Sequence, residues 1–172
     1  MTKVPVIESE RLVLRGLRLE DADAIATKIM DWDVIKMLAR PPFPYSRDDA
    51  HRYLAKAVDY PWEFAITQRG GSDLLGVVGV TGHLGYWLGK DHWGQGYMTE
   101  ATVALVDSYF STTTSGKIIS GVFTDNPGSQ GVLRKLGFVE VGRSKMFCNS
   151  RAAGVDHIDV VLSRADWRRT AA

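Results

Sequence analysis

The chain has little of what extracellular, metal-binding or nucleic-acid-binding proteins usually contain. Its single cysteine, Cys148, permits no internal disulfide, which is typical of a cytoplasmic protein. The histidines are dispersed, with no HExxH motif and no Cys/His cluster, so we expect no metal site. The formal net charge is only +1, whereas nucleic-acid-binding domains usually carry a basic excess. We therefore expect a cytoplasmic protein without a metal and without a nucleic-acid partner.

Long hydrophobic runs are missing as well. The longest apolar stretches are far shorter than the roughly 20 residues that a membrane-spanning helix needs. Residues 1–5 lack the apolar core of a signal peptide. No repeat or low-complexity segment occurs, and 172 residues correspond to one domain. The sequence thus predicts a single domain over residues 1–172 with no membrane partner.

Two segments carry most of the information, and each of them opens a helix. In the first, an apolar strand with the sequence GYWLG (residues 85–89) precedes WGQGYMTEA (residues 93–101). The first amides of a helix have no intrahelical partner, and the helix dipole adds partial positive charge there. Gly94 and Gly96 allow the backbone to approach a phosphate closely, because they carry no Cβ. This segment predicts an anion-binding site.

The second segment is NPGS (residues 126–129), followed by LGF (residues 136–138). Pro127 falls in the first turn of the expected helix, where its missing amide costs nothing. Two such helix openings with a strand between them indicate a ligand that has both phosphates and an amide-rich arm.

Hydrophobic periodicity predicts a mixed α/β fold. The expected strands are residues 11–15, 63–67, 74–80, 84–88, 117–123, 138–147 and 156–162. The expected helices are residues 20–30, a helix from the N-cap Ser46 through Val58, one after the glycine loop, and one from Pro127 to its stop at Gly137. We expect a central, mostly antiparallel sheet with helices on both faces, a buried 117–123 strand, and a solvated tail containing Arg164, Arg168 and Arg169.

These segments resemble the GNAT acetyltransferase superfamily, and most closely its ribosomal-protein N-terminal acetyltransferase (RimJ/RimL-like) subgroup. The resemblance rests on GYW before GxGYxTEA at residues 94–101, and on NxxS and LGF after it. The opening ERLVLR (residues 10–15) and the ending DVVLS (residues 159–163) also match. It implies the GNAT fold, in which a splayed pair of parallel strands holds acetyl-CoA as a co-substrate.

The resemblance also implies which residues bind the coenzyme. Backbone amides would hold its pyrophosphate and the Thr99 hydroxyl would add a contact, the amides being those of Gly94, Gln95, Gly96, Tyr97 and Met98. Amides near Trp87 and Leu88 would face the thioester carbonyl. The sequence departs from the family at Trp93, Gln95 and Met98, which weakens side-chain contacts to phosphate and leaves the backbone site intact.

The implied reaction is direct attack of an amine on the thioester, which needs no acyl-enzyme. Asn126 would bond the pantetheine amide or orient the acceptor, although Asn-Pro is also good N-cap chemistry. Ser129 would protonate the departing thiolate, and the alternative is a hydroxyl that bonds its own helix backbone. Cys148 is interpreted as a small buried side chain rather than a nucleophile.

The general base is the least defined part. The subgroup often has glutamate where His83 stands, and imidazole suits a base near neutral pH. His83 can also be interpreted as a solvent-exposed histidine in a turn. The other candidates for the general base are Glu63, Asp156, His157 or a water. The aromatics Trp32, Phe43, Tyr45 and Trp62 either line an acceptor pocket or serve in packing.

The predicted function is N-acetylation of a primary amine, most favourably the α-amine of a protein N-terminus, peptide or amino acid. The alternatives are an acyl-CoA-binding module that has lost catalysis and a small-molecule acetyltransferase acting on aminoglycosides or polyamines. A dinucleotide-binding oxidoreductase is discounted because the third glycine of that fingerprint is missing after Gly96. The sequence leaves the oligomeric state open, a homodimer included.

Overall fold

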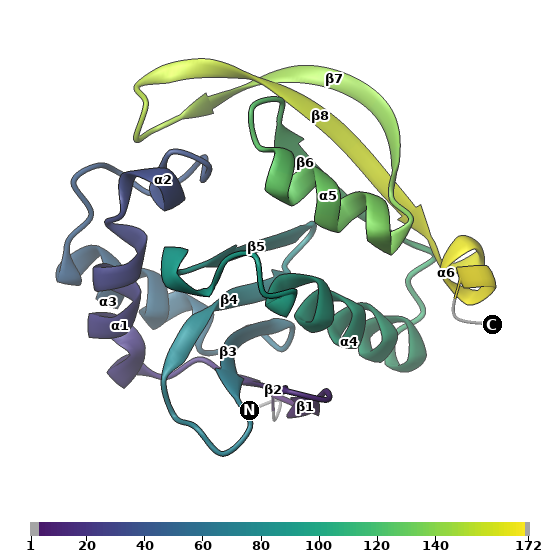
Figure 1. Cartoon of the computed structure of the whole chain (residues 1–172), viewed down its shortest axis with the longest axis horizontal. Coiled ribbons are helices and arrows are strands. Elements are labelled where there is room, and N and C mark those ends of the chain that lie inside the picture. Colours follow the sequence, from purple (N-terminus) through teal and green to yellow (C-terminus); the bar gives the residue numbers. More distant parts are fainter. Residues whose placement is uncertain (1–3, 171–172) are drawn as a thin grey trace.

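An eight-stranded sheet forms the centre of the computed structural model, which describes residues 4–170 and side chains through Trp167 (Figure 1). The spatial order of the strands is β1-β2-β3-β4-β5-β6-β8-β7. Neighbouring strands are antiparallel except β5 and β6, which are parallel. The strands are β1 (Ile7–Glu8), β2 (Leu12–Gly16), β3 (Glu63–Gln68), β4 (Leu74–Val80), β5 (Leu84–Leu88), β6 (Lys117–Phe123), β7 (Val139–Cys148) and β8 (Ala153–Ser163). The expected mixed, mostly antiparallel sheet is confirmed.

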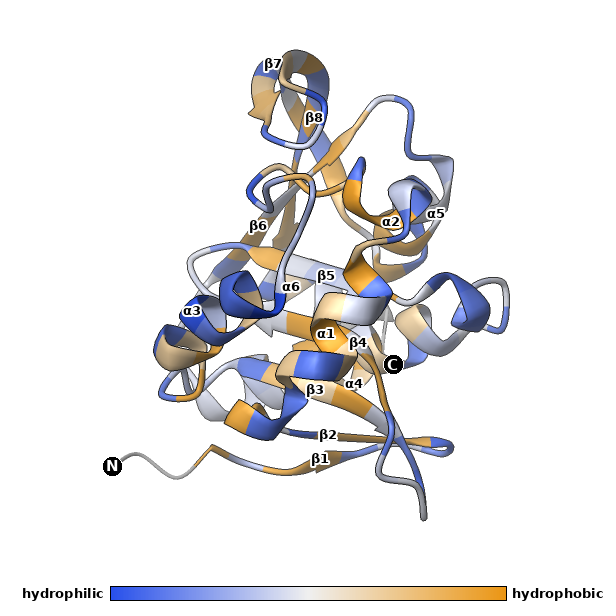
Figure 2. Ribbon diagram, turned by 90° about the vertical axis from the view of Figure 1, so that its left-hand side faces the viewer, coloured by the Kyte–Doolittle hydropathy of each residue, from blue (hydrophilic) through white to orange (hydrophobic). Residues whose placement is uncertain are grey.

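Helices cover both faces of this sheet. They are α1 (Ala22–Ile29), α2 (Trp32–Ile35), α3 (Arg47–Ala57), α4 (Tyr97–Thr112), α5 (Pro127–Leu136) and α6 (Arg164–Thr170), with 3-10 turns at Leu19–Asp21 and Lys90–His92. Figure 1 shows α1 and α3 together on one side and α4 on the other, while β7 and β8 arch over α5. Figure 2 shows the same two strands as an arm that projects beyond the helices.

Two separate cores result from this layering. The first joins the sheet to α4, α5 and α6, with Leu105, Leu136 and Leu162 almost completely buried. The second joins the other face to α1, α2 and α3, with Ile25 and Leu54 at its centre. Alternation of side chains along each strand therefore decides whether a residue faces α4 and α5 or faces α1 to α3.

Local sequence signals set several element boundaries. Ser46 and Asp49 form a reciprocal capping box at the start of α3, a device that stabilises a helix by about 1 kcal/mol. Gly137 ends α5 in the left-handed region at φ 89°, which favours glycine. The inner face expected for α3 is confirmed, since Ala50, Leu54 and Ala57 are buried.

Some expectations were wrong. The strand at 117–123 is only half-buried, because Ile118 and Val122 face α5 whereas Ile119 is 47% exposed on a face that no described helix covers. The first helix begins at Ala22, after a 3-10 turn. Arg164 is not in a solvated tail: it starts α6, and its guanidinium donates to the carbonyls of Thr113 and Ser115. The side chains of Arg168 and Arg169 lie outside the described part.

Candidate active site

The glycine loop between β5 and α4 exposes unpaired backbone donors. Gly94 and Gly96 adopt φ +71° and +78°, in the left-handed region. No protein atom lies within 4 Å of where a Cβ on Gly94 would stand, so the backbone there is open to a ligand. Gly96 is the N-cap of α4 and makes no side-chain cap, so the first amides of the helix, at Tyr97, Met98 and Thr99, have no intrahelical partner. The loop has the shape and polarity that an anion requires.

The side chains of the loop mostly turn away from that opening. Trp93 donates its indole N–H to the Leu88 carbonyl at 2.9 Å, and Gln95 donates to the Asp91 carbonyl at 3.2 Å. Tyr97 and Met98 are buried in the core, where the Tyr97 hydroxyl accepts a bond from Gln68. The departures from the family pattern at Trp93, Gln95 and Met98 therefore fall on side chains whose contacts are internal.

Arg11, from the turn between β1 and β2, braces this loop. Its guanidinium donates to the Gln95 carbonyl at 3.0 Å and to the Glu100 carboxylate at 2.7 Å. The Arg11 amide and the Ser9 hydroxyl also donate to Glu100. Burial alone would raise the pKa of Glu100, but these bonds from Ser9 and Arg11 hold it below its usual value. The sequence offered no role for Arg11, because its partners are about ninety positions away.

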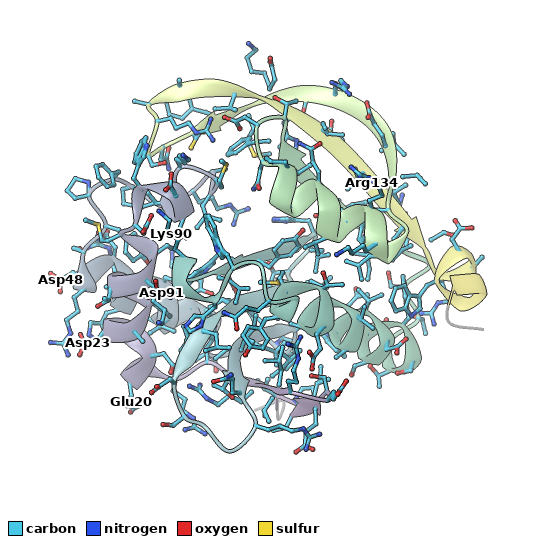
Figure 3. All side chains as sticks on the ribbon, viewed as in Figure 1. Glu20, Asp23, Asp48, Lys90, Asp91 and Arg134 are labelled. Atoms are coloured by element: carbon cyan, nitrogen blue, oxygen red, sulfur yellow. The ribbon has the colours of Figure 1, made fainter. Side chains whose placement is uncertain are left out.

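The loop is also tied to the second helix layer. The Lys90 ammonium bonds Asp33 of α2 at 2.7 Å, and Lys36 bonds the same carboxylate at 2.6 Å. Lys36 and Lys90 lower the pKa of Asp33 to about 2. Figure 3 shows Lys90 at the start of the loop, below α2.

The parallel strands β5 and β6 separate immediately before this loop. They share one residue pair, Leu84 with Ser120, whose hydroxyl donates to the Leu84 carbonyl at 2.8 Å. Beyond it β5 continues along β4 to Leu88, and β6 continues along β8 to Phe123. The Gly89 amide donates to Leu75 of β4, so by alternation the Leu88 amide faces the gap and the Trp87 amide faces β4. We call this gap, from Leu84–Ser120 to Leu88 and Phe123, the split.

A pair of hydroxyls crosses the split on its α5 side. The Tyr86 hydroxyl lies 2.8 Å from Ser129 Oγ and also donates to the Ser129 carbonyl at 3.3 Å. Asn126 caps α5, because its Oδ1 accepts from the Ser129 amide at 3.1 Å. Burial raises the pKa of Tyr86 to about 12, against a smaller lowering by the bond to Ser129, so Tyr86 stays protonated as a donor. Tyr86 was missed from the sequence because it precedes Ser129 by 43 positions on a different element.

Among the residues named as candidate bases, His83, Glu63 and His157 lie on the face of the sheet opposite α4 and α5, whereas Asp156 lies on the same face as Ile158. His83 is exposed in the turn before β5; burial, then Arg40 and His157, lower its pKa. Glu63 accepts a bond from the Tyr53 hydroxyl at 2.6 Å, and burial raises its pKa. Asp156 is exposed and pairs with Lys145 at 3.3 Å. The structure therefore brings His83 and His157 together and keeps Asp156 apart.

The four aromatics do not line one pocket. Trp32 and Phe43 are exposed and pack edge to face at 5.1 Å, whereas Tyr45 is buried in the α1–α3 core. Trp62 packs against Tyr109 at 5.0 Å on the α4 side. Tyr45 therefore packs in a core, whereas Trp62 both packs against Tyr109 and lines a groove of about 360 Å³ with Arg40 and Tyr60.

The tip of the β7–β8 hairpin closes the side of the site near α2. The Asn149 amide donates to the Ala39 carbonyl at 2.9 Å, and Arg151 donates to Lys36 and pairs with Asp125 at 2.7 Å. Cys148 is fully buried in this contact, as expected, with its Sγ 3.3 Å from the Leu38 carbonyl.

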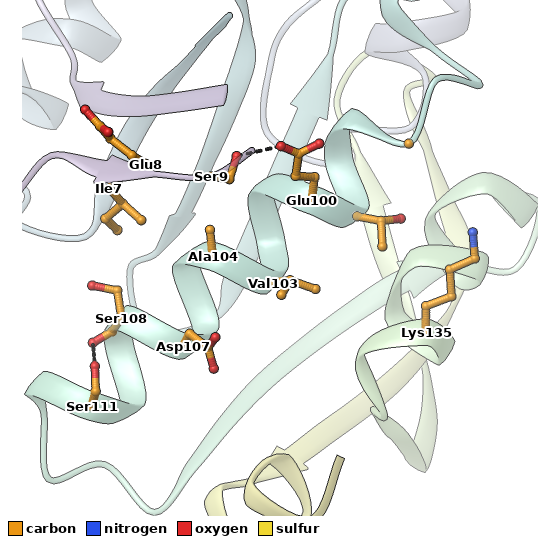
Figure 4. Close-up of a pocket in the computed structure, with 12 residues that line it drawn as sticks. Ile7, Glu8, Ser9, Glu100, Val103, Ala104, Asp107, Ser108, Ser111 and Lys135 are labelled. Atoms are coloured by element: carbon orange, nitrogen blue, oxygen red, sulfur yellow. Dashed lines mark hydrogen bonds between the residues drawn. The ribbon is translucent and has the colours of Figure 1, made fainter. Parts of the chain in front are cut away.

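A groove of about 970 Å³ runs from Gly96 and Thr99 along the outer side of α4 (Figure 4). Carboxylates line it at Glu8, Glu100 and Asp107, with only Lys135 opposite. These carboxylates disfavour a phosphate along the groove, beyond the start of α4. Among the described residues no group of three or more His, Cys, Asp or Glu side chains can hold a metal, and no helix is long and apolar enough to cross a membrane.

The comparisons with known proteins agree with this geometry. The family model described as "Acetyltransferase (GNAT) domain" matches residues 11–139. A Bacillus licheniformis protein described as an uncharacterized N-acetyltransferase, p20, is 27% identical over 161 residues, which cover 86% of this chain and 90% of that protein.

Two solved structures share the fold. The ribosomal-protein-S5-alanine acetyltransferase of Vibrio fischeri superposes with a TM-score of 0.80 at 22% identity, covering 95% of this chain and 98% of that one. RimJ of Mycobacterium smegmatis, in complex with CoA-disulfide, superposes with a TM-score of 0.76 at 21% identity, covering 95% and 89%.

Proposed function

Because the chain belongs to the GNAT acetyltransferase family, we propose that it transfers the acetyl group of acetyl-CoA directly to an α-amine, that of a protein N-terminus, a peptide or an amino acid. The observation that carries the proposal is the split, which ends at Leu88 before the glycine loop and is crossed by the Tyr86–Ser129 pair. One domain over residues 1–172 would supply every residue of the reaction.

The backbone is well suited to hold the coenzyme. The amides of the glycine loop and of the first turn of α4 would bind the pyrophosphate, and Gly94 leaves room for it. The pantetheine arm would lie in the split like an additional strand, because the edges of β5 and β6 are unpaired there beyond Leu84 and Ser120. The Leu88 amide would then face the thioester carbonyl, and fixed donors of this kind contribute about 3 kcal/mol to catalysis.

The hydroxyl pair would serve the leaving group. The Tyr86 hydroxyl donates to the Ser129 carbonyl, and either hydroxyl of the Tyr86–Ser129 pair can donate to the other, so Ser129 would keep a proton to give to the departing sulfur. Ser129 would protonate the thiolate, while Tyr86 and the Asn126 cap hold the first turn of α5 in position. No acyl-enzyme is needed, and Cys148 is buried away from the split.

The chemistry near the split favours an α-amine acceptor. An α-amine has a pKa of about 7.7–8.0 and a lysine side chain about 10.4, so deprotonating lysine costs roughly 3–4 kcal/mol more at neutral pH. An imidazole base, with an ordinary pKa near 6.5, would match an acceptor that is already partly neutral. The Vibrio fischeri protein is named for a protein substrate, ribosomal protein S5. A net charge of +1 gives little long-range attraction for polyamines or aminoglycosides.

The test is thiol release from acetyl-CoA with a panel of amines. Matched peptides with free and blocked N-termini, each with and without lysine, are assayed beside free amino acids, spermidine and an aminoglycoside, and mass spectrometry maps the acetylated nitrogen. We expect turnover with free N-termini and none with blocked ones. Acetylation of lysine ε-amines alone, or turnover of the aminoglycoside but of no α-amine, would refute the acceptor. Calorimetric binding of acetyl-CoA without turnover of any amine would identify a binding module instead.

A further inference from the structure

His157 of β8 occupies a built polar site on the face of the sheet opposite α4 and α5. It is only 8% exposed, and its ring packs edge to face against Phe123 of β6. Its Nδ1 lies 2.9 Å from Asp159 Oδ1 and 3.4 Å from Ser144 Oγ, and Ser144 also donates to Asp159 at 3.1 Å. The carboxylate accepts only, so Nδ1 carries the proton of the neutral ring and Nε2 carries the lone pair.

The Nε2 atom of His157 is left available. No hydrogen bond to it occurs among the residues that the structure describes. No buried side-chain nitrogen or oxygen in that part of the chain lacks a partner, so Nε2 reaches the surface. The imidazole has one nitrogen fixed by a carboxylate and the other free to accept a proton.

The position of the ring relates it to the split. The ring lies directly on Gly121, where a Cβ would overlap Cε1 and Nε2. Gly121 follows Ser120, the single residue of β6 that pairs with β5. On the other side, Gly85 follows Leu84 and presents open space, with only the His83 ring within 4 Å of a Cβ placed there. The free Nε2 therefore stands where β5 and β6 begin to part.

The two faces of the split carry different chemistry. Leu84, Tyr86 and Leu88 of β5 face the α4–α5 core, as do Ile158 and Val160 of β8. By alternation, Gly85 and His157 face the other way. Ser129 and Tyr86 thus lie on one face, and the imidazole lies on the other.

From this arrangement we propose that His157 is the general base that takes the proton of the acceptor amine, with Asp159 and Ser144 as positioning residues that hold its tautomer. The proposal rests on the proposed acetyl transfer and names the residue that serves it. His83 has no hydrogen bonds of this kind to hold its tautomer. It makes no side-chain hydrogen bond among the described residues and lies exposed in a turn.

The charged groups around His157 are few. Asp159 lies on its own strand, His83 precedes β5, and the Arg151–Asp125 pair lies across the Phe123 ring, with Arg151 5.2 Å from that ring. Only Asp159 contacts the imidazole directly. It is the partner that stabilises the imidazolium form during transfer.

The acetyl transfer forms one bond, breaks one bond and moves two protons. The nitrogen lone pair of the amine forms the N–C bond to the thioester carbonyl carbon, and the electron pair of the C–S bond leaves with sulfur. His157 Nε2 takes one proton from nitrogen, and Ser129 gives one proton to sulfur. The products are the amide and the free thiol of CoA. The proton on His157 returns through solvent to the Ser129–Tyr86 pair, so the protein ends as it began.

The test compares His157→Ala with His83→Ala, a matched removal of the neighbouring imidazole on the same face. With wild-type turnover established, we expect His157→Ala to lower kcat by about 100-fold or more, as loss of a general base does. The KM for acetyl-CoA should stay within about twofold, and added imidazole should restore part of the rate, more so for more basic imidazoles. His83→Ala removes the rival imidazole, and a loss of kcat as large as that of His157→Ala would overturn the choice of His157 as the base.

Two further variants separate positioning from structure. Asp159→Asn should lower kcat about tenfold in the wild type and cause no additional loss in the His157→Ala background, because it acts through the imidazole. If His157→Ala does not fold, His157→Gln keeps the size of the side chain and should show the same loss. A kcat within threefold of wild type in the His157 variants, or a loss that imidazole does not rescue, would overturn the role of His157 alone. A wild type that acetylates no amine would overturn the proposed function and this role with it.

Discussion

Replacing Gly94 by alanine is the sharpest perturbation of the glycine loop. Its φ of +71° lies in the left-handed region, and the added Cβ would meet no protein atom within 4 Å. Any effect on ligand binding beyond the backbone strain must therefore come from the ligand itself. We expect Gly94→Ala to fold and to bind acetyl-CoA weakly, because the methyl group enters the space of the pyrophosphate.

The size of both effects can be worked out. A non-glycine residue in the left-handed region costs roughly 1–2 kcal/mol. For a domain of this length each 1 kcal/mol shifts Tm by about 2–4 °C, so we expect a decrease of about 2–8 °C. A hydrogen bond to a charged group contributes about 1.5–3 kcal/mol. Displacing one phosphate contact should therefore raise the Kd for acetyl-CoA by about 10- to 150-fold.

Gly70→Ala is the matched control for this prediction. Gly70 has φ +74° and equally open surroundings, but it lies in the turn between β3 and β4, away from the split. Thermal unfolding should show similar decreases in Tm for the two variants, and calorimetry should show weakened acetyl-CoA binding for Gly94→Ala only. Equal Kd values for the two variants would refute the assignment of the loop to the pyrophosphate.

Four other outcomes follow from the site. Ser129→Ala should lower kcat about tenfold or more with little change in the Kd for acetyl-CoA, since the thiolate is protonated only in the transition state; Tyr86→Phe should cause a smaller loss, because it removes only the hydroxyl that orients Ser129. Arg11→Ala should raise the Kd for acetyl-CoA about fivefold or more and leave kcat at saturation unchanged, because it frees the loop and Glu100. The fold favours neutral His83, whose pKa is lowered, so the unfolded chain binds more protons below pH 6.5 and the free energy of unfolding should decrease as pH falls through that range.

Each of these has a contrary result. Parallel losses of binding and kcat in Ser129→Ala would make Ser129 a coenzyme contact. A lowered kcat in Arg11→Ala, with an unchanged Kd for acetyl-CoA, would refute the idea that Arg11 holds the glycine loop in place for the coenzyme. For the histidine, urea denaturation between pH 5 and 8 is compared with His83→Asn, which cannot titrate; identical pH dependence in the two proteins would show that His83 does not contribute.

Much of the fold was predictable because its signals are local. Ser46 with Asp49, the glycines that start α4 and end α5, and the β3–β4 hairpin each depend on neighbours within a few residues. The predictions that failed concern tertiary context. Ile119 is β-branched yet exposed, because it points away from the core that holds Ile118 and Val122 and the second core does not reach β6. Arg164 was expected in a solvated tail, but its guanidinium donates to the carbonyls of Thr113 and Ser115, directly after α4.

The candidate site was likewise predictable where its features are local and unpredictable where they depend on tertiary contacts. The glycine loop could be found from the sequence, since its function depends on backbone conformation that glycine signals directly. The hydrogen-bond partners of the side chains in the site could not be found from the sequence. Tyr86 meets Ser129, and Arg11 meets Glu100, only because the sheet brings separate strands and helices together. The positions of these contacts are set by strand register, which single-sequence patterns do not specify.

The single residue pair between β5 and β6 also bears on the local opening of the sheet. The sheet consists of two parts, β1–β5 and β6–β8–β7, whose strands pair only at Leu84 and Ser120. Side-chain packing and the hydrogen bonds of Tyr86, Asn149 and Arg151 also join the two parts. A pantetheine arm hydrogen-bonded to the edges of β5 and β6 would add the inter-strand contacts that these two strands lack. Hydrogen exchange in β6 and β8 should then slow on binding far more than exchange in β2 and β3, and the coenzyme would act as the last strand of the sheet.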